Sequence, residues 1–173
     1  MDRQVVRDEM ERARQTFHRL LDSATVGELS RPSNGTKWTN GQLLFHMLFG
    51  YLIVVRLLVL VRIFGRLPNG VSRAFARALE ASTRPFHVIN YLGSVGGPRL
   101  LGYAGMGRRF DQVVAKLIRH LDQESEAELL RGMHYPTSWD PYFKAHMTLA
   151  DVYRYPTQHF EHHRCQLTLD APD

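Results

Sequence analysis

The sequence of 173 residues is poor in thiols, since Cys165 is its single cysteine. One cysteine excludes an intramolecular disulfide, and free thiols are typical of proteins in a reducing cytoplasm. The N-terminal residues form a charged amphipathic pattern and have no apolar core like that of a secretory signal. We therefore expect a cytoplasmic protein.

Concentrated positive charge is also lacking, although the formal net charge is +5. The basic residues are scattered, the densest group is Arg108-Arg109, and no basic run alternates with aromatic residues. Proteins that bind nucleic acid usually gather arginine and lysine on one face or along one helix. We therefore expect a small-molecule partner and no nucleic acid.

Glycine-rich phosphate motifs are missing as well. Glycines punctuate residues 93–107, but they form neither a Walker-type loop nor a G-x-G-x-x-G motif. The sequence predicts a plain connecting loop over 93–107, and a lid over a pocket is the alternative.

No uninterrupted apolar run is long enough to cross a membrane. Residues 43–64 are strongly apolar, but His46, Arg56 and Arg62 interrupt them, whereas a span needs about 20 mostly apolar residues. We interpret this segment as a central bundle helix that other helices or a second subunit cover. Membrane contact is not expected, although a bundle that holds an apolar ligand or lies against a membrane stays open as an alternative.

Apolar residues at helical spacing predict four long helices. The first carries a stripe from Val6 to Leu20 and ends before Pro32, because the residue before a proline avoids helical geometry. The second begins at a capping box of Thr39 and Gln42 and runs to about residue 66. The third covers about 108–123.

The fourth long helix begins at a second capping box, 148–151, and contains Pro156, which either kinks it or restarts it. Short helices are predicted over 71–81 and 85–95, and 134–143 is predicted to be an ordered loop held by aromatic residues. Apolar and polar residues nowhere alternate convincingly with a period of two, so the sequence indicates no strand. The sequence thus predicts one all-α domain over 1–173, a four-helix bundle with extra short helices between the second and third long helices.

Histidines provide the main chemical signal. His159 and His163 are four residues apart, so on a helix their imidazoles lie on one face and can share one metal ion. His46 lies on the apolar stripe of the second helix and is the best candidate for a third ligand. Three neutral nitrogens with an open coordination position would suit a reactive centre that holds water, a thiolate or a carboxylate.

Three further residues are candidates for the same site. Gln166 follows His163 by three residues and is our candidate catalytic residue, because it can orient a ligand or a bound water; a packing or surface role is the alternative. Arg56 and Arg108 are candidates for binding a cofactor or substrate carboxylate, and solvated surface charge is the simpler explanation for both.

Three segments together resemble a known family. They are W-T-N-G-Q-L-L-F-H-M at 38–47, T-L-A-D at 148–151 and H-F-E-H-H-R-C-Q-L at 159–167, and they are similar to the DinB/YfiT-like superfamily of metalloenzymes. The resemblance implies a four-helix bundle of up-down-down-up topology, often a homodimer. It also implies a divalent-metal site that maps to His46, His159 and His163.

The resemblance also implies an activity. Members include mycothiol-dependent maleylpyruvate isomerase and S-transferases that use low-molecular-weight thiols, in which the metal binds and activates the thiol. We therefore expect a metal-dependent enzyme that activates a thiol such as mycothiol for transfer or isomerisation. Zinc is the expected ion, with nickel and iron open. A hydrolase that uses metal-bound water is the alternative.

Overall fold

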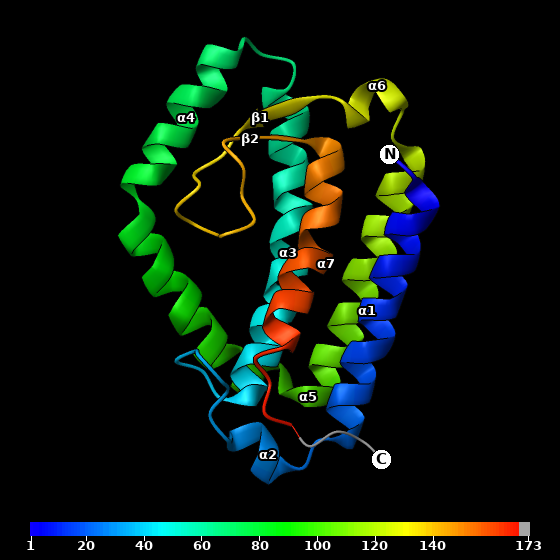
Figure 1. The fold of residues 1–173 in the computed structure, drawn as a ribbon, viewed down its shortest axis with the longest axis vertical. Helices are drawn as coiled ribbons and strands as arrows, with labels where there is room; N and C mark the ends of the chain where they lie inside the picture. Colours follow the sequence, from blue (N-terminus) through cyan, green and yellow to red (C-terminus); the bar gives the residue numbers. More distant parts are fainter. Residues whose placement is uncertain (170–173) are drawn as a thin grey trace.

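The computed structural model describes residues 1–169. Four helices lie side by side along its long axis: α1 (Arg3–Ser23), α3 (Asn40–Phe64), the second half of α5 (Thr83–Gln123) and α7 (Leu149–Arg164) (Figure 1). Helices α1 and α7 run in one direction, and α3 and the second half of α5 run in the other. The predicted all-α bundle with up-down-down-up order is confirmed.

Side-chain caps fix where the predicted helices begin. Thr39 accepts from the backbone N–H of Gln42, and the Gln42 side chain accepts from the backbone N–H of Thr39. Thr148 and Asp151 form the same reciprocal pair at the start of α7. Both predicted capping boxes are therefore confirmed, and each satisfies two backbone donors that a helix start leaves free.

The core is formed where α1, α3, α5 and α7 meet. The predicted stripe of α1 is buried from Val6 to Phe17. The Phe17 ring stacks on Phe110 with centroids 4.3 Å apart, and Tyr51 packs against Phe110 at 4.7 Å. Aromatic rings from α1, α3 and α5 thus pack against one another in the core.

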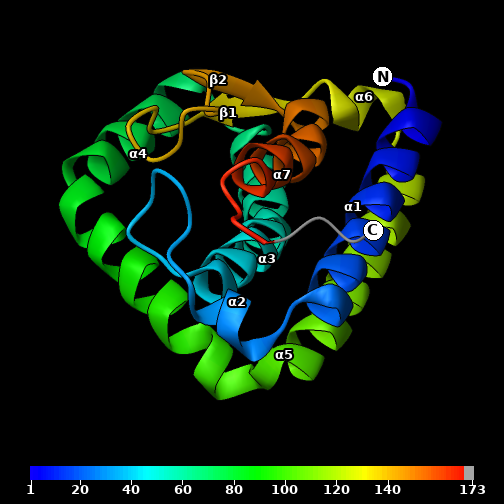
Figure 2. The ribbon, with the colours of Figure 1, turned by 60° about the horizontal axis from the view of Figure 1, so that its bottom comes forward.

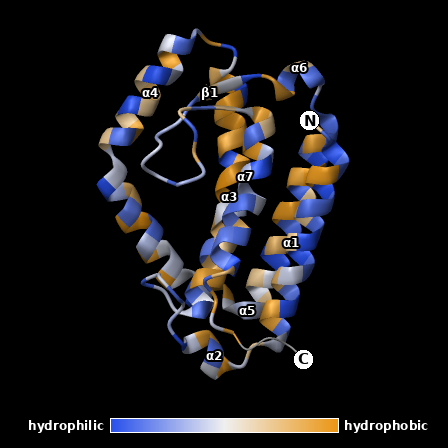
Figure 3. Ribbon diagram, viewed as in Figure 1, coloured by the Kyte–Doolittle hydropathy of each residue, from blue (hydrophilic) through white to orange (hydrophobic). Residues whose placement is uncertain are grey.

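Helix α3 is apolar enough to be mistaken for a membrane span. Hydrophobic residues occupy much of its length (Figure 3), but 61% of its most apolar 18-residue window is buried inside the protein. The interpretation as a central bundle helix agrees with this burial.

A separate arm connects α3 to the second half of α5. Because these two segments run in the same direction, the chain must return along the whole bundle between them. Helix α4 (Asn69–Ala81) and the first half of α5 make this return and stand to one side of α3 and α7 (Figure 2). The arm contains the two short helices that were predicted over 71–81 and 85–95.

The prediction of a connecting loop over 93–107 is wrong, and so is the start of the third long helix at 108. These residues are helical within α5, apart from one break at Gly102, which has φ 64° and ψ 161°. Glycine adopts this backbone conformation without the steric cost that other residues incur. Gly97 has a second role, because a Cβ there would overlap the ring of Phe45. The glycines therefore permit one sharp turn and one close contact between helices.

Smaller differences from the predicted elements lie at the bundle's ends. The first helix ends at Ser23, and the separate short helix α2 (Val26–Ser30) precedes Pro32. Helix α6 (Glu126–Leu129) follows α5. Helix α7 continues through Pro156 without interruption.

A short antiparallel pair was missed in the sequence. Strands β1 (Gly132–His134) and β2 (His146–Thr148) pair through three residues each, too few to give a readable alternation. The loop between them is anchored to the arm as expected from its aromatics: Trp139 stacks on Phe86 at 3.9 Å and donates to the carbonyl of Leu79.

Candidate metal centre

Imidazoles from two helices converge beside the arm. His46 lies in the second turn of α3, and His159 and His163 lie one turn apart near the end of α7. One ring nitrogen from each lies within 4.8 Å of the other two. The structure thus brings together the three histidines predicted to share an ion.

The spacing and surroundings of these nitrogens fit a divalent ion. His46 Nε2 and His159 Nε2 are 3.2 Å apart. Two nitrogens bound to one tetrahedral zinc are separated by about 3.3–3.4 Å, given the usual zinc–nitrogen bond length. His159 Nδ1 is buried without a hydrogen-bond partner among the described residues and lies against Gly50, where a Cβ would be only 2.6 Å from it. The glycine lets the ring lie flat on α3 with Nε2 directed at the other imidazoles.

Burial keeps all three rings in the form that binds metal. Burial, and then the nearby His163, lowers the pKa of His46 to about 3. Burial, and then His46 and His163, holds the pKa of His159 well below its usual range. Burial also lowers the pKa of His163. Neutral imidazoles have the free lone pair that a metal ion requires.

Neighbouring side chains fix the orientation of two rings. The Gln166 Oε1 atom is 2.7 Å from His163 Nδ1, which donates to it. This hydrogen bond leaves the lone pair of His163 on Nε2. The Ser94 hydroxyl, from the arm, is 3.3 Å from His46 Nδ1, and the ring of Trp38 stacks on His46 at 4.4 Å. Gln166 therefore contacts a candidate ligand, as a positioning residue does.

A cavity of about 210 Å³ opens beside the histidines. Its walls come from α3, α7, the first half of α5 and the loop between β1 and β2, and they are largely aromatic or aliphatic. Its volume is below the usual range of about 300–1,000 Å³ for small-molecule sites. The arm and the loop thus shape the space next to the candidate ligands.

Asp140 is the one carboxylate among the described residues that line this cavity. Its Oδ2 atom is 3.7 Å from His159 Nε2. Tyr155 Oη and the backbone N–H of Tyr142 each donate to the carboxylate at 2.8 Å. Burial raises the pKa of Asp140, and these hydrogen bonds oppose the shift. The centre therefore has a carboxyl group that two donors hold in place.

A family model described as the DinB superfamily matches residues 9–167. The chain belongs to the DinB superfamily. Searches of curated proteins and of solved structures found no significant match. The family match covers all three segments on which the resemblance was based, and the His46, His159 and His163 cluster lies inside it.

The candidate residues Arg56 and Arg108 of this DinB-superfamily protein lie away from the cluster, and so do the thiol of Cys165 and the imidazole of His146. Arg56 lines a different cavity, between α3 and α5, and Arg108 is exposed on α5 and lines neither cavity. Cys165 is exposed past the end of α7. His146 lies in β2 against His134, with ring centroids 5.2 Å apart.

Sequence reasoning missed Asp140 and the wall provided by the arm. Asp140 lies in a loop 19 positions before His159, so no ligand-type spacing connects them. His87 and Asn90 also line the cavity, from a segment that was predicted only as a short helix. The one available signal was the density of aromatic residues around Asp140, which predicted an ordered loop.

Proposed function

We propose that this DinB-superfamily protein is a metal-dependent enzyme that activates a low-molecular-weight thiol for transfer or isomerisation. The observation that carries the proposal is the convergence of His46, His159 and His163 at the wall of a largely apolar cavity. A divalent ion bound there acts as a Lewis acid and lowers the pKa of a coordinated thiol or water.

Charge balance favours an anionic partner in the open position. Three neutral imidazoles leave the two positive charges of an ion uncompensated, and a buried charge is costly unless it is paired. The Asp140 carboxylate, 3.7 Å from His159 Nε2, supplies one negative charge. A thiolate supplies the second, which makes the loaded site neutral overall.

The chain's own residues then have separate tasks. Gln166 holds the ring of His163 so that Nε2 faces the centre. The rings of Trp139 and Phe143, from the loop, and of Phe86, from the arm, limit access of water to the cavity. If a thiol were bound at the three histidines, an apolar acceptor could lie against these rings.

Metal content provides the first test. The purified protein should contain about one divalent ion per chain, and His159→Ala should lose it because two ligands hold an ion weakly. His162→Ala is the matched control: this neighbouring histidine is exposed on α7 and should leave the metal content unchanged. Equal metal content in the two variants would contradict the proposal.

The reaction class requires a second measurement. The loaded protein is assayed for thiol consumption with mycothiol and an electrophilic acceptor, and in parallel for release of nitrophenol from nitrophenyl esters. Thiol turnover that His159→Ala abolishes supports the proposal. Ester hydrolysis without thiol turnover would assign the hydrolase alternative, and no turnover in either assay would favour a binding module.

A further inference from the structure

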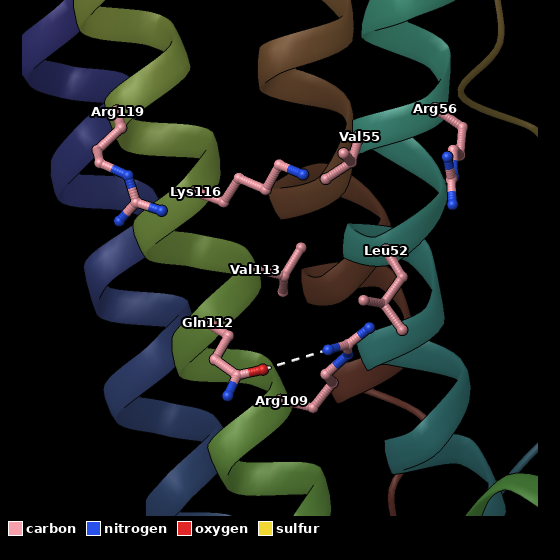
Figure 4. A pocket seen from close by; sticks show the side chains of 8 residues that line it. All are labelled: Leu52, Val55, Arg56, Arg109, Gln112, Val113, Lys116 and Arg119. Atoms are coloured by element: carbon pink, nitrogen blue, oxygen red, sulfur yellow. Dashed lines mark hydrogen bonds between the residues drawn. The ribbon is translucent and has the colours of Figure 1, made fainter.

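A second cavity, of about 490 Å³, lies between α3 and the second half of α5 (Figure 4). Its charged side chains are all basic: α5 contributes Arg109, Lys116 and Arg119, and α3 contributes Arg56. Lys116 follows Arg109 by seven positions, and Arg119 follows Lys116 by three. The three residues therefore lie on one face of α5, along about 15 Å of the helix axis. No carboxylate is among the described residues that line this second cavity, which we call the groove.

Some basic residues elsewhere in the described part of the chain are paired with carboxylates. Ion pairs with carboxylates involve Arg3, Arg7, Arg14, Arg62, Arg66, Lys144 and Arg164. In the groove, Arg109 donates to Gln112 Oε1 at 3.2 Å, and none of the four cations has an ion pair with a carboxylate within residues 1–169. Burial, followed by Arg62 and Lys116, lowers the pKa of the nearby His120, in line with a positive field on this face.

The floor of the groove is apolar. Leu52 and Val55 of α3 and Val113 of α5 line it, and Lys116 reaches across from α5 toward Val55 (Figure 4). Val59, one turn further along α3, is 47% exposed and continues the strip. Helix α3 is apolar on most of its circumference, and on this side its Leu52 and Val55 are only partly buried. The groove therefore combines an apolar floor with a positively charged rim.

We propose that this groove binds an organic phosphate that carries an apolar substituent. A phosphate monoester has close to two negative charges at neutral pH and accepts several hydrogen bonds, which suits a site with four unpaired cations. Arginine and lysine are the usual phosphate partners. The substituent packs on Leu52, Val55 and Val113.

The same features exclude two other occupants. A symmetric contact between two copies would bring like charges together, so the groove does not suit self-association. Single-stranded nucleic acid is usually bound with aromatic rings that stack on bases, and no aromatic residue lines this groove among the described residues. The site is also distinct from the metal centre, whose cavity takes Phe49, Ile53 and Leu57 from α3.

The test uses 1-naphthyl phosphate as the probe, with 1-naphthol and inorganic phosphate as the two half-ligands, in calorimetric titrations of the full chain. The probe should bind more tightly than either half-ligand.

The double variant K116Q/R119Q should weaken probe binding by about tenfold or more, because each of its two substitutions removes a charged hydrogen-bond donor. Arg77→Gln, which removes one exposed positive charge from the arm, should have little effect. His159→Ala should also bind the probe normally, so failure of the metal proposal and failure of this one are separable.

A lipid headgroup is a second source of the same chemistry. Vesicles of phosphatidylcholine with and without phosphatidic acid are therefore mixed with the same variants and sedimented. Sedimentation that requires phosphatidic acid and is lost in K116Q/R119Q assigns the phosphate to a lipid, and probe binding alone assigns a soluble ester. Absence of saturable binding in both arms, or equal binding by wild type and K116Q/R119Q, overturns the proposal. Unchanged circular dichroism of the double variant rules out misfolding.

Discussion

At the scale of single residues, the candidate centre depends on which ring nitrogen bears the proton. The Gln166 side chain accepts from His163 Nδ1 at 2.7 Å and therefore selects the tautomer whose lone pair is on Nε2. His159 has no such partner on its Nδ1 atom within residues 1–169 and packs against Gly50. The two ligands of α7 are thus held by different means, one polar and one steric.

We expect Gln166→Ala to weaken zinc binding by about 10–100-fold, the usual effect of removing a hydrogen bond to a metal ligand. The His163 ring loses the acceptor that orients it, while all three ligands remain. Zinc affinity is measured by competition with a chromogenic chelator. Gln158→Ala, at an exposed position of α7, is the control. Equal zinc affinities of the two variants would show that Gln166 has no positioning role.

Residues of the centre differ in how far the sequence could predict them. His159 and His163 were predictable because four-residue spacing on a helix fixes their relative positions, and His46 because it interrupts an apolar stripe. Asp140 was not, since its place depends on a hairpin with three residues per strand and on Trp139 stacking against the arm. Contacts between segments distant in sequence leave no periodic signal.

At the scale of elements, α5 shows why glycine content alone mispredicts a helix. Each glycine weakens a helix by about 0.5–1 kcal/mol relative to alanine, so a glycine-rich segment favours a loop on propensity. Packing against α3 reverses that preference, because Gly97 allows the helix to approach the ring of Phe45. The two capping boxes were predicted correctly because they depend only on local sequence. Thr39 and Thr148 each form hydrogen bonds with a residue three positions further along the chain.

Two neighbouring glycines of α5 should respond oppositely to alanine. Gly97→Ala places a methyl group in the ring of Phe45 and should destabilise the protein by about 1–3 kcal/mol, the cost of overpacking. Gly96→Ala meets no atom within 4 Å and should be neutral or stabilising, by up to about 1 kcal/mol. Denaturant unfolding measures both. A loss of stability in Gly96→Ala equal to that in Gly97→Ala would argue against close packing as the reason for the glycine.

At the scale of the whole molecule, the topology creates the site. Because α3 and the second half of α5 run in the same direction, the chain needs a return segment, and this arm lies where α3 and α7 present their histidines (Figure 1). The bundle supplies the three imidazoles, and the arm and the β1–β2 loop supply the cavity walls. Without the walls that the arm and the β1–β2 loop supply, the cavity beside the histidines would be open.

An ion held by His46 of α3 and by the two histidines of α7 also links two bundle helices, so metal should stabilise the whole fold. At a free zinc concentration 100 times the dissociation constant, binding to the folded state alone adds about 2.7 kcal/mol. For a chain of this size that corresponds to a rise in melting temperature of about 5–10 °C. Thermal melts of chelator-treated protein, with and without added zinc, measure the shift. His46→Ala should abolish it and His162→Ala should retain it. If zinc raises the melting temperature of His46→Ala as much as that of wild type, the ion does not bridge the two helices.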